Sequence, residues 1–204
     1  MYSPGMTASI KGRGTAARPP GRFERSIIEA LPADEPVPLP RIITQVQPEL
    51  ARSIITRNRS PDLPFEQSIN PYRGCEHGCI YCFARPSHAY VGLSPGLDFE
   101  TRLFYKRDAA ALLVAELARP GYRCRPIMLG TNTDPYQPIE REHRVTRSLL
   151  EVLWQCRHPV AILTKGALLE RDLELIATMA RAGLARVTLS LPTRRRGSAT
   201  ISFA

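Results

Sequence analysis

Short apolar runs alternate with amphipathic segments from about residue 65 onward, and this alternation limits the possible folds more than any other feature of the chain. Runs typical of buried strands lie at residues 67–70, 126–130, 160–164 and 186–191. Between them, residues 109–118, 145–156 and 169–180 are predicted to form helices, two of them with the apolar spacing of one helix face. Strands that alternate with helices in this way form a parallel sheet with right-handed crossovers. The sequence therefore predicts an α/β fold with about four βα units.

Individual residues in these helices carry more specific expectations. Asp108 is expected to cap the first helix, because an aspartate side chain accepts hydrogen bonds from free backbone N–H groups. Cys156 falls on the apolar face of the second helix, which predicts a buried and inert thiol. Gly183 suits the left-handed position that ends the third helix. Cys124 has no predicted role.

Chemically unusual residues follow each predicted strand. A cysteine-rich loop follows the first strand, and Thr131, Asn132, Thr133 and Asp134 follow the second. Lys165 follows the third strand, and Ser190 lies at the end of the fourth. Because parallel sheets bind ligands at the C-terminal ends of their strands, we expect a ligand site at this edge. Asn and Asp also favour turns, so a simple turn before Pro135 is the alternative for the second group.

The cysteine-rich loop has the spacing C-x3-C-x2-C, formed by Cys75, Cys79 and Cys82. Soft thiolate ligands favour iron–sulfur clusters or zinc. Three cysteines hold three irons of a 4Fe–4S cluster and leave the fourth iron open to a small molecule, whereas an electron-transfer cluster normally has four cysteines. The alternative is a zinc site completed by His77 or His88, which would stabilise a nucleic-acid-binding module without catalysis.

The same loop resembles the signature of the radical S-adenosylmethionine (SAM) superfamily, in which an aromatic residue, here Tyr81, precedes the last cysteine. The flanking residues 68–75, 81–85 and 88–90 resemble a bacterial branch that is related to spore photoproduct lyase. Further segments resemble the same branch, namely residues 130–138, 164–165, 11–14 and 21–24. The resemblance extends from about residue 11 to about residue 193.

This resemblance implies a partial parallel (β/α) barrel of the radical SAM type, an incomplete form of the TIM barrel. It implies a 4Fe–4S cluster on Cys75, Cys79 and Cys82, with SAM on the open iron. Reductive cleavage of SAM then produces a 5′-deoxyadenosyl radical that takes a hydrogen atom from the substrate. The positions that match SAM contacts are Tyr81, Thr131, Asn132, Thr133, Asp134, Lys165 and Ser190. No other catalytic residue is assigned, and a strand-end lysine such as Lys165 is also typical of a surface charge.

Substrate and partners are less constrained than the cofactors. Repair of a thymine lesion in DNA is an expectation by analogy with the related lyase, and the net charge of +9 is compatible with a nucleic acid partner. The chemistry implies a reductant such as flavodoxin or ferredoxin. Five cysteines, three of them crowded, do not form a secreted disulfide framework. With no signal sequence and no membrane-spanning apolar stretch, we expect a cytoplasmic protein without a membrane partner.

Changes in composition suggest three regions. Residues 1–64 are rich in Pro, Gly and Arg and are expected to be largely extended or flexible, with 11–20 as a tail. Residues 65–193 are expected to form the radical SAM core, and 194–204 a tail outside the family pattern. Family members continue further, so a premature end is our hypothesis, and it predicts an unpaired edge on the fourth strand. We expect cluster binding to survive and turnover to depend on the additional segments.

Overall fold

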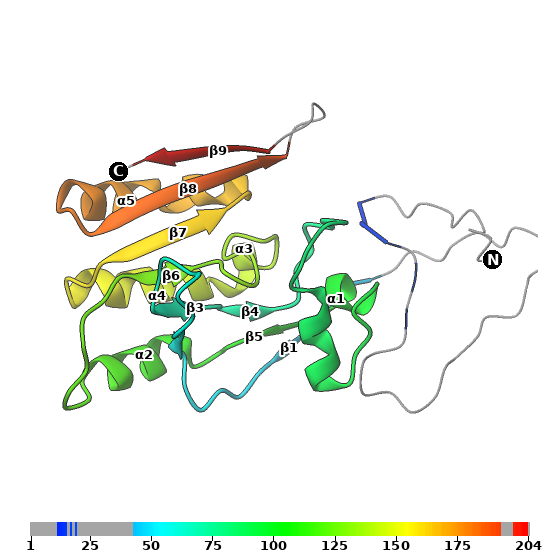
Figure 1. Ribbon diagram of the computed structural model, residues 1–204, viewed down its shortest axis with the longest axis horizontal. Helices are drawn as coiled ribbons and strands as arrows, with labels where there is room; N and C mark the ends of the chain where they lie inside the picture. The colour runs from blue at the N-terminus through cyan, green and yellow to red at the C-terminus, as the bar shows by residue number, and fades with distance from the viewer. Residues whose placement is uncertain (1–11, 16, 18, 20–42, 193–197, 204) are drawn as a thin grey trace, which may run out of the picture. The chain divides into compact units, whose positions relative to one another are not determined.

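The computed structural model describes residues 12–15, 17, 19, 43–192 and 198–203 (Figure 1). The chain divides into two compact units, each built from segments that are separate in the sequence. The first unit comprises Met1–Gln47 and Arg73–Phe104, and the second comprises Pro48–Tyr72 and Tyr105–Ala204. Among the described residues, no helix combines the length and apolar character that crossing a membrane requires.

A six-stranded sheet forms the centre of the second unit, in the order β2-β3-β6-β7-β8-β9. Its strands are β2 (Thr56–Arg57), β3 (Gln67–Ile69), β6 (Ile127–Leu129), β7 (Val160–Thr164), β8 (Ala185–Pro192) and β9 (Ser198–Phe203). The four strands from β3 to β8 are mutually parallel, and β2 and β9 add an antiparallel strand at either edge. The predicted α/β class with four parallel strands is therefore confirmed, and it is consistent with a partial radical SAM barrel.

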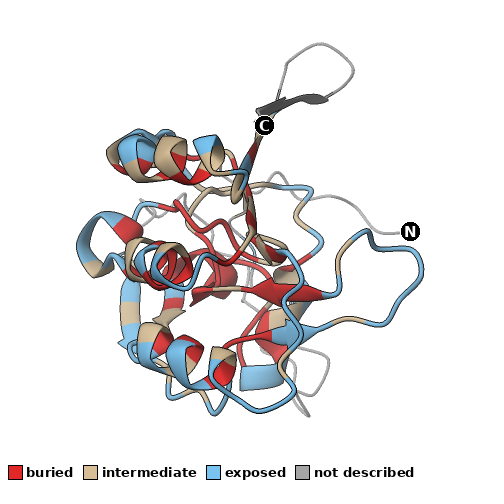
Figure 2. Cartoon of the chain, turned by 90° about the vertical axis from the view of Figure 1, so that its left-hand side faces the viewer, coloured by how far each residue is buried: buried red, intermediate tan, exposed pale blue. Residues whose placement is uncertain are grey.

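Helices connect the parallel strands of this sheet, as the periodicity predicts. They are α2 (Ala109–Leu117), α3 (Glu140–His143), α4 (Val145–Gln155), the 3-10 helix η2 (Ala167–Asp172) and α5 (Leu173–Arg181). The core contains fully buried apolar side chains from both strands and helices, among them Ile69, Leu129, Leu149 and Met179. Figure 2 shows the buried residues along the strands and on the inner faces of the helices.

The specific expectations for the helix ends have mixed outcomes. Gly183 follows α5 with a φ of +70°, as predicted. Asp108 lies at the start of α2 but makes no capping hydrogen bond, and its carboxylate pairs instead with Arg107 at 3.5 Å. The prediction of a buried thiol at Cys156 is wrong, because α4 ends at Gln155 and Cys156 lies exposed in the turn that follows.

The expected free edge on β8 is also wrong. β9 pairs with β8 in antiparallel orientation from Val187↔Phe203 to Pro192↔Ser198. Residues 198–203 alternate polar Ser and Thr with Ala, Ile and Phe, which is the period-two pattern of a strand. The expectation of a free edge rests on the lack of a further βα unit, and it does not consider an antiparallel edge strand.

Short elements make up the first unit. A three-stranded sheet of order β1-β5-β4 lies mostly in it, with strands β1 (Gln45–Pro48), β5 (Arg102–Tyr105) and β4 (Tyr72–Arg73). The 3-10 helix η1 (Arg85–Val91) and helix α1 (Asp98–Thr101) follow the cysteine loop. Elements of this length show no hydrophobic period, so the sequence pattern gives no signal for them. The proposed regions 1–64, 65–193 and 194–204 stay predictions.

Candidate functional site

The cysteine loop is attached to the core of the first unit at its two ends. The backbone N–H of Cys75 donates to the carbonyl of Phe99 at 2.9 Å, and the N–H of Cys82 donates to the carbonyl of Cys79 at 3.3 Å. Cys75 is buried with Ala84 and Phe99, and the partly buried Cys82 packs against the same group. All three cysteines are free thiols. The loop therefore holds two of its thiols on one apolar support.

Gly74, directly before the first cysteine, can only be glycine in this structure. Its φ is +77°, a left-handed conformation that other residues rarely adopt. A Cβ atom there would lie 2.5 Å from a methyl carbon of Leu103 and 2.8 Å from the carbonyl oxygen of Phe99. The tight approach of this backbone to Phe99 is what brings Cys75 into the core.

The number of cysteines in the loop fits an iron–sulfur cluster with one open iron. Zinc needs all of its ligands within about 2.3 Å of one metal, so their donor atoms crowd around one point. In the described part of the chain, no three His, Cys, Asp or Glu side chains are arranged to hold one metal ion. In a 4Fe–4S cluster each thiolate binds a different iron, which spreads the sulfurs apart. Three free thiols within one short loop fit this second arrangement.

His88, a fourth ligand in the zinc alternative, is part of the core instead. It is fully buried, and its ring packs edge-on against Phe99 with centroids 5.2 Å apart. Its Nε2 lies 2.8 Å from the carbonyl oxygen of Arg102. Burial lowers the pKa of His88, and the hydrogen bond to Arg102 opposes that shift only in part. His88 is thus a neutral packing residue, while His77 is half-buried and no role is assigned to it.

Two charged residues to which the sequence analysis assigns no role support the cysteine loop. Arg85 donates to the carbonyl oxygen of Cys79 from Nε at 3.2 Å and from Nη2 at 2.9 Å, and to that of Gly96 at 3.1 Å. The same guanidinium forms an ion pair with the fully buried carboxylate of Glu100. Sequence spacing gives no signal for this pair, since it depends on the turn between η1 and α1. Arg85 and Glu100 therefore fix the backbone of the middle cysteine.

In the second unit, Asn70 organises the loop that follows β6. Its Oδ1 accepts hydrogen bonds from the backbone N–H groups of Asn132 at 2.8 Å and Thr133 at 3.3 Å. Its Nδ2 donates to Oγ1 of Thr131 at 3.2 Å. The hydroxyl of Thr133 donates to the carbonyl of Tyr72 at 2.9 Å. The side chain at the end of one parallel strand thus shapes the polar loop at the end of the next.

Asp134 joins this loop to the end of β7. Its Oδ1 accepts from the backbone N–H of Tyr136 at 2.8 Å and from the hydroxyl of Thr164 at 2.6 Å. Its Oδ2 accepts from the backbone N–H of Lys165 at 2.8 Å. The structure therefore brings the Asp134 side chain and the Lys165 backbone together at the strand ends. The bond from Tyr136 is also that of an Asx turn, the alternative interpretation of this segment.

Two further residues expected at the site, Ser190 and Tyr81, belong to other elements. Ser190 lies on β8, opposite Thr200 of β9, and is partly exposed. Tyr81 belongs to the cysteine loop of the first unit and is exposed, like its neighbours Ile80 and Phe83. The roles given to these positions in SAM binding stay predictions.

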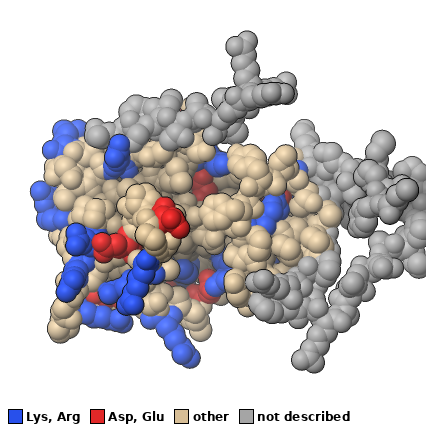
Figure 3. All heavy atoms as spheres, in the orientation of Figure 1, with Lys and Arg blue, Asp and Glu red and all other residues tan. Residues whose placement is uncertain are grey.

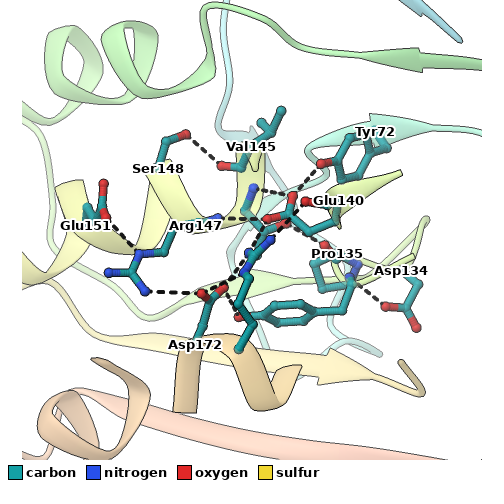
Figure 4. A network of polar contacts seen from close by, with 12 residues as sticks. Tyr72, Asp134, Pro135, Glu140, Val145, Arg147, Ser148, Glu151 and Asp172 are labelled. Carbon is teal, nitrogen blue, oxygen red and sulfur yellow. Dashed lines mark hydrogen bonds and ion pairs between the residues drawn. The ribbon is translucent and has the colours of Figure 1, made fainter. Parts of the chain in front are cut away.

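A buried polar network contacts the loop after β6 (Figure 4). Glu140 and Asp172 are fully buried, and Arg171 pairs with both, at 2.6 Å and 2.7 Å. Tyr136 donates to Asp172 at 3.1 Å, and Tyr72 donates to Glu140. Within the second unit, the network connects Tyr72 with the loop after β6 and with the start of α5. It was not foreseen, because its members are distant in the sequence.

Charges in the network follow from its hydrogen bonds. Burial alone would raise the pKa of Asp172, but hydrogen bonds from Arg171 and Arg147 outweigh burial and hold that pKa below its ordinary value. Burial raises the pKa of Tyr136, and the adjacent Asp172 raises it further. Asp172 is thus held as an acceptor, and Tyr136 is held as a donor.

Comparison with known proteins gives a family match over most of this chain. The sequence profile of the Radical SAM superfamily matches residues 69–196, which include the cysteine loop and the parallel strands β6, β7 and β8. No solved structure matches the chain.

Among curated proteins, uncharacterized proteins of Mycobacterium tuberculosis and Mycobacterium bovis are each 47% identical to this chain over 129 residues. These matches cover 63% of this chain and 38% of each relative. An uncharacterized protein of Methanocaldococcus jannaschii is 30% identical over 111 residues, which cover 52% of this chain and 38% of that protein. The matched region therefore spans well under half the length of these relatives.

Proposed function

We propose, on the premise that this chain belongs to the radical SAM superfamily, that Cys75, Cys79 and Cys82 hold a 4Fe–4S cluster that binds SAM. Such a cluster, when bound, supplies the electron that cleaves SAM reductively to a radical able to take hydrogen from a substrate. The observation that carries the proposal is a short loop with three thiols, matched by the family and packed against the core through Cys75 and Cys82. The protein is then an enzyme of this superfamily.

The chain's own residues have distinct parts in this proposal. Arg85 and Glu100 hold the backbone of Cys79, so that the middle ligand does not depend on the cluster for its position. Thr131 and Asn132 are partly exposed, and their hydroxyl and amide groups can bind the amino group of SAM. Asp134 already accepts three hydrogen bonds, so we assign it the orientation of this loop and of Lys165.

Metal analysis tests the cluster. The chain is purified without oxygen and reconstituted with iron and sulfide, and iron, sulfide and zinc are measured with the absorption spectrum. We expect about four irons per chain and a brown colour. Cys82→Ala should lose the cluster, whereas Cys124→Ala and Cys156→Ala should keep it, because both of those thiols are exposed and outside the motif. One zinc per colourless chain would overturn the proposal in favour of the zinc module.

The finer proposal concerns the substrate. The resemblance to the branch of spore photoproduct lyase suggests a lesion in DNA, although a fold relationship alone does not establish a reaction. Exposed arginines favour a polyanion, including Arg119, Arg123, Arg125 and Arg157. Figure 3 shows Lys and Arg side chains gathered over the part of the second unit that carries α2, α4 and α5.

Salt dependence separates a nucleic acid substrate from a nonspecific surplus of charge. Binding of a thymine-containing duplex, with and without a photolesion, is measured between about 50 and 200 mM salt, where phosphate contacts lose most of their affinity. We expect tighter binding of the damaged duplex at every salt concentration. Equal binding of both duplexes would contradict a lesion substrate. Turnover in addition requires an electron donor such as flavodoxin or ferredoxin.

A further inference from the structure

The N-terminal segment Gly12–Thr15 lies directly against the cysteine loop of the same unit. The surroundings of Gly14 show how close the two backbones are, since a Cβ atom at this position would overlap the carbonyl oxygen of Gly78. In the opposite direction, a Cβ on Gly78 would lie 3.1 Å from the backbone nitrogen of Gly14 and 3.3 Å from the carbonyl oxygen of Gly12. Gly78 is the residue directly before Cys79. The described part of the expected tail is thus in contact with the cysteine motif.

Hydrogen bonds fasten this segment on both sides of the loop. Arg13 donates from Nη1 to the carbonyl oxygen of Glu100 at 2.8 Å and from Nη2 to Oγ1 of Thr44 at 2.7 Å. The hydroxyl of Thr44 in turn donates to Oε1 of Glu76 at 2.5 Å, and Glu76 directly follows Cys75. The guanidinium of Arg13 also lies 3.9 Å from that carboxylate oxygen. Arg13 therefore ties the segment to the loop and to its support.

Glu100 is the residue that joins the segment to the rest of the support. Its Oε2 accepts from the backbone N–H of Gly14 at 3.0 Å, while its Oε1 pairs with Arg85, which holds the carbonyl of Cys79. The Glu100 side chain is fully buried. A buried carboxylate that lost either partner would be left partly unpaired, which is costly. The contacts of Glu100 with Gly14 and with Arg85 therefore stabilise each other.

We propose that Gly12–Thr15 is a strap that positions the cysteine loop, with Glu100 as its buried anchor and Arg13 and Arg85 as positioning residues. The strap deepens and rests on the proposed cluster function, because it contacts the segment between the first two cluster ligands. The strap keeps the cysteine loop of the metal-free chain in the conformation that binds the cluster. The loop would otherwise have to be ordered when iron binds, which would weaken binding by the cost of that ordering.

Hydrogen–deuterium exchange of the metal-free chain tests the strap. Gly14→Ala and Arg13→Gln each weaken it without touching a cysteine, and Arg107→Gln is the control, since Arg107 pairs with Asp108 on the surface. We expect peptides that contain Cys75–Cys82 to exchange roughly tenfold faster in both variants, as loss of a hydrogen bond to a charged group permits. Peptides from β6, β7 and β8 should be unchanged, and the control should match wild type throughout.

Unchanged exchange at Cys75–Cys82 in both variants would overturn the proposal. A rise of equal size in β6, β7 and β8 would overturn it too, because the segment would then serve general stability. Since this readout needs no cluster, a wild-type chain that assembles none contradicts the proposed function alone and leaves the strap to be decided by exchange.

Reconstitution then shows what the strap does for the cluster. Gly14→Ala and Arg13→Gln should require several-fold more iron and sulfide to reach half occupancy, with the same absorption spectrum once loaded. A positioning role predicts this shift, whereas an equal iron requirement in both variants and wild type would contradict it.

Discussion

The two units of this protein hold their polar site residues in different ways. In the second unit, regular strands and helices place Asn70, Asp134 and Lys165 at neighbouring strand ends, and a buried network supports the loop between them. In the first unit, the cysteine loop is held by hydrogen bonds from Arg85, whose guanidinium pairs with the buried carboxylate of Glu100. Regular structure thus positions one set of residues, and charged side chains position the other.

This difference changes what each unit can tolerate. Loss of a network member in the second unit should destabilise packed βα units, because strands and helices share its carboxylates. Loss of a support in the first unit should release a short loop and leave the sheet intact. Each of the following predictions tests one side of this contrast.

The largest effect is expected for Arg171→Ala in the second unit. It leaves the fully buried carboxylates of Glu140 and Asp172 without their shared partner, and such uncompensated charge costs about 3–5 kcal/mol. Chemical denaturation measures the free energy of unfolding. The matched control is Arg181→Ala, which removes an exposed side chain that donates to Thr178 and should cost about 0.5 kcal/mol or less. Equal losses in the two variants would show that the network does not stabilise this unit.

A second test compares two glycines with similar left-handed backbones, one in each unit. Gly74 has a φ of +77° and is crowded by Leu103 and Phe99, whereas Gly183 has a φ of +70° and open space around it. Gly183→Ala should cost only the backbone strain, about 1 kcal/mol. Gly74→Ala adds overpacking and should cost about 2–4 kcal/mol in all, by local unfolding of the first unit. Local exchange and denaturation measure both, and equal costs would contradict the close packing at Gly74.

Asp134→Asn should have a smaller effect. The amide keeps one acceptor oxygen where the carboxylate provides two, so at least one of the donors Tyr136 N–H, Thr164 Oγ1–H and Lys165 N–H loses its partner. A buried donor left unsatisfied costs about 1–3 kcal/mol. Asp108→Asn is the control, because Asp108 is exposed and makes no capping bond. A cost at Asp134 no greater than at Asp108 would show that Asp134 does not join the two loops.

The smallest effect concerns pH and His158 in the second unit. Burial lowers its pKa below the ordinary 6.5, while its Nδ1 bond to Pro159 opposes the shift, and Tyr122 lies 2.7 Å from its Nε2. Below pH 6.5 the unfolded chain therefore binds a proton that the folded chain resists. Stability is full above pH 6.5 and falls as the pH drops, by at most about 1.4 kcal/mol per pH unit. Denaturation at pH 7.5 and 5.5 should show a smaller fall in His158→Gln, and an identical fall would exclude His158 as the cause.

The sequence predicts the parallel strands and their helices well, because buried strands and amphipathic helices have characteristic hydrophobic patterns. It also places Asp134 and Lys165 at the ends of neighbouring strands, since parallel strands end at one edge, but it does not predict the hydrogen bond between them. The same reasoning fails at Cys156, where the apolar pattern continues one residue beyond the last turn of α4.

Residues that act through long-range contacts could not be found in this way. Arg85 and Glu100 are ordinary charged residues in the sequence, and only the fold shows that one carboxylate is buried between Arg85 and Gly14. Arg171 and Glu140 belong to the same class. Hydrogen-bond partners depend on three-dimensional approach, for which hydrophobic period gives no signal. The composition around Gly12–Thr15 is typical of flexible tails, so the sequence gives no indication of the strap.

The central claim is that Cys75, Cys79 and Cys82 leave one iron of a cluster open to SAM. The most direct measurement is the electron spin resonance spectrum of the reduced, reconstituted chain with and without SAM, with Cys156→Ala as the matched control. The account predicts a reduced-cluster signal that changes when SAM is added, in wild type and in the control alike. A full cluster whose signal is the same with and without SAM would contradict an open iron, and with it the proposed function.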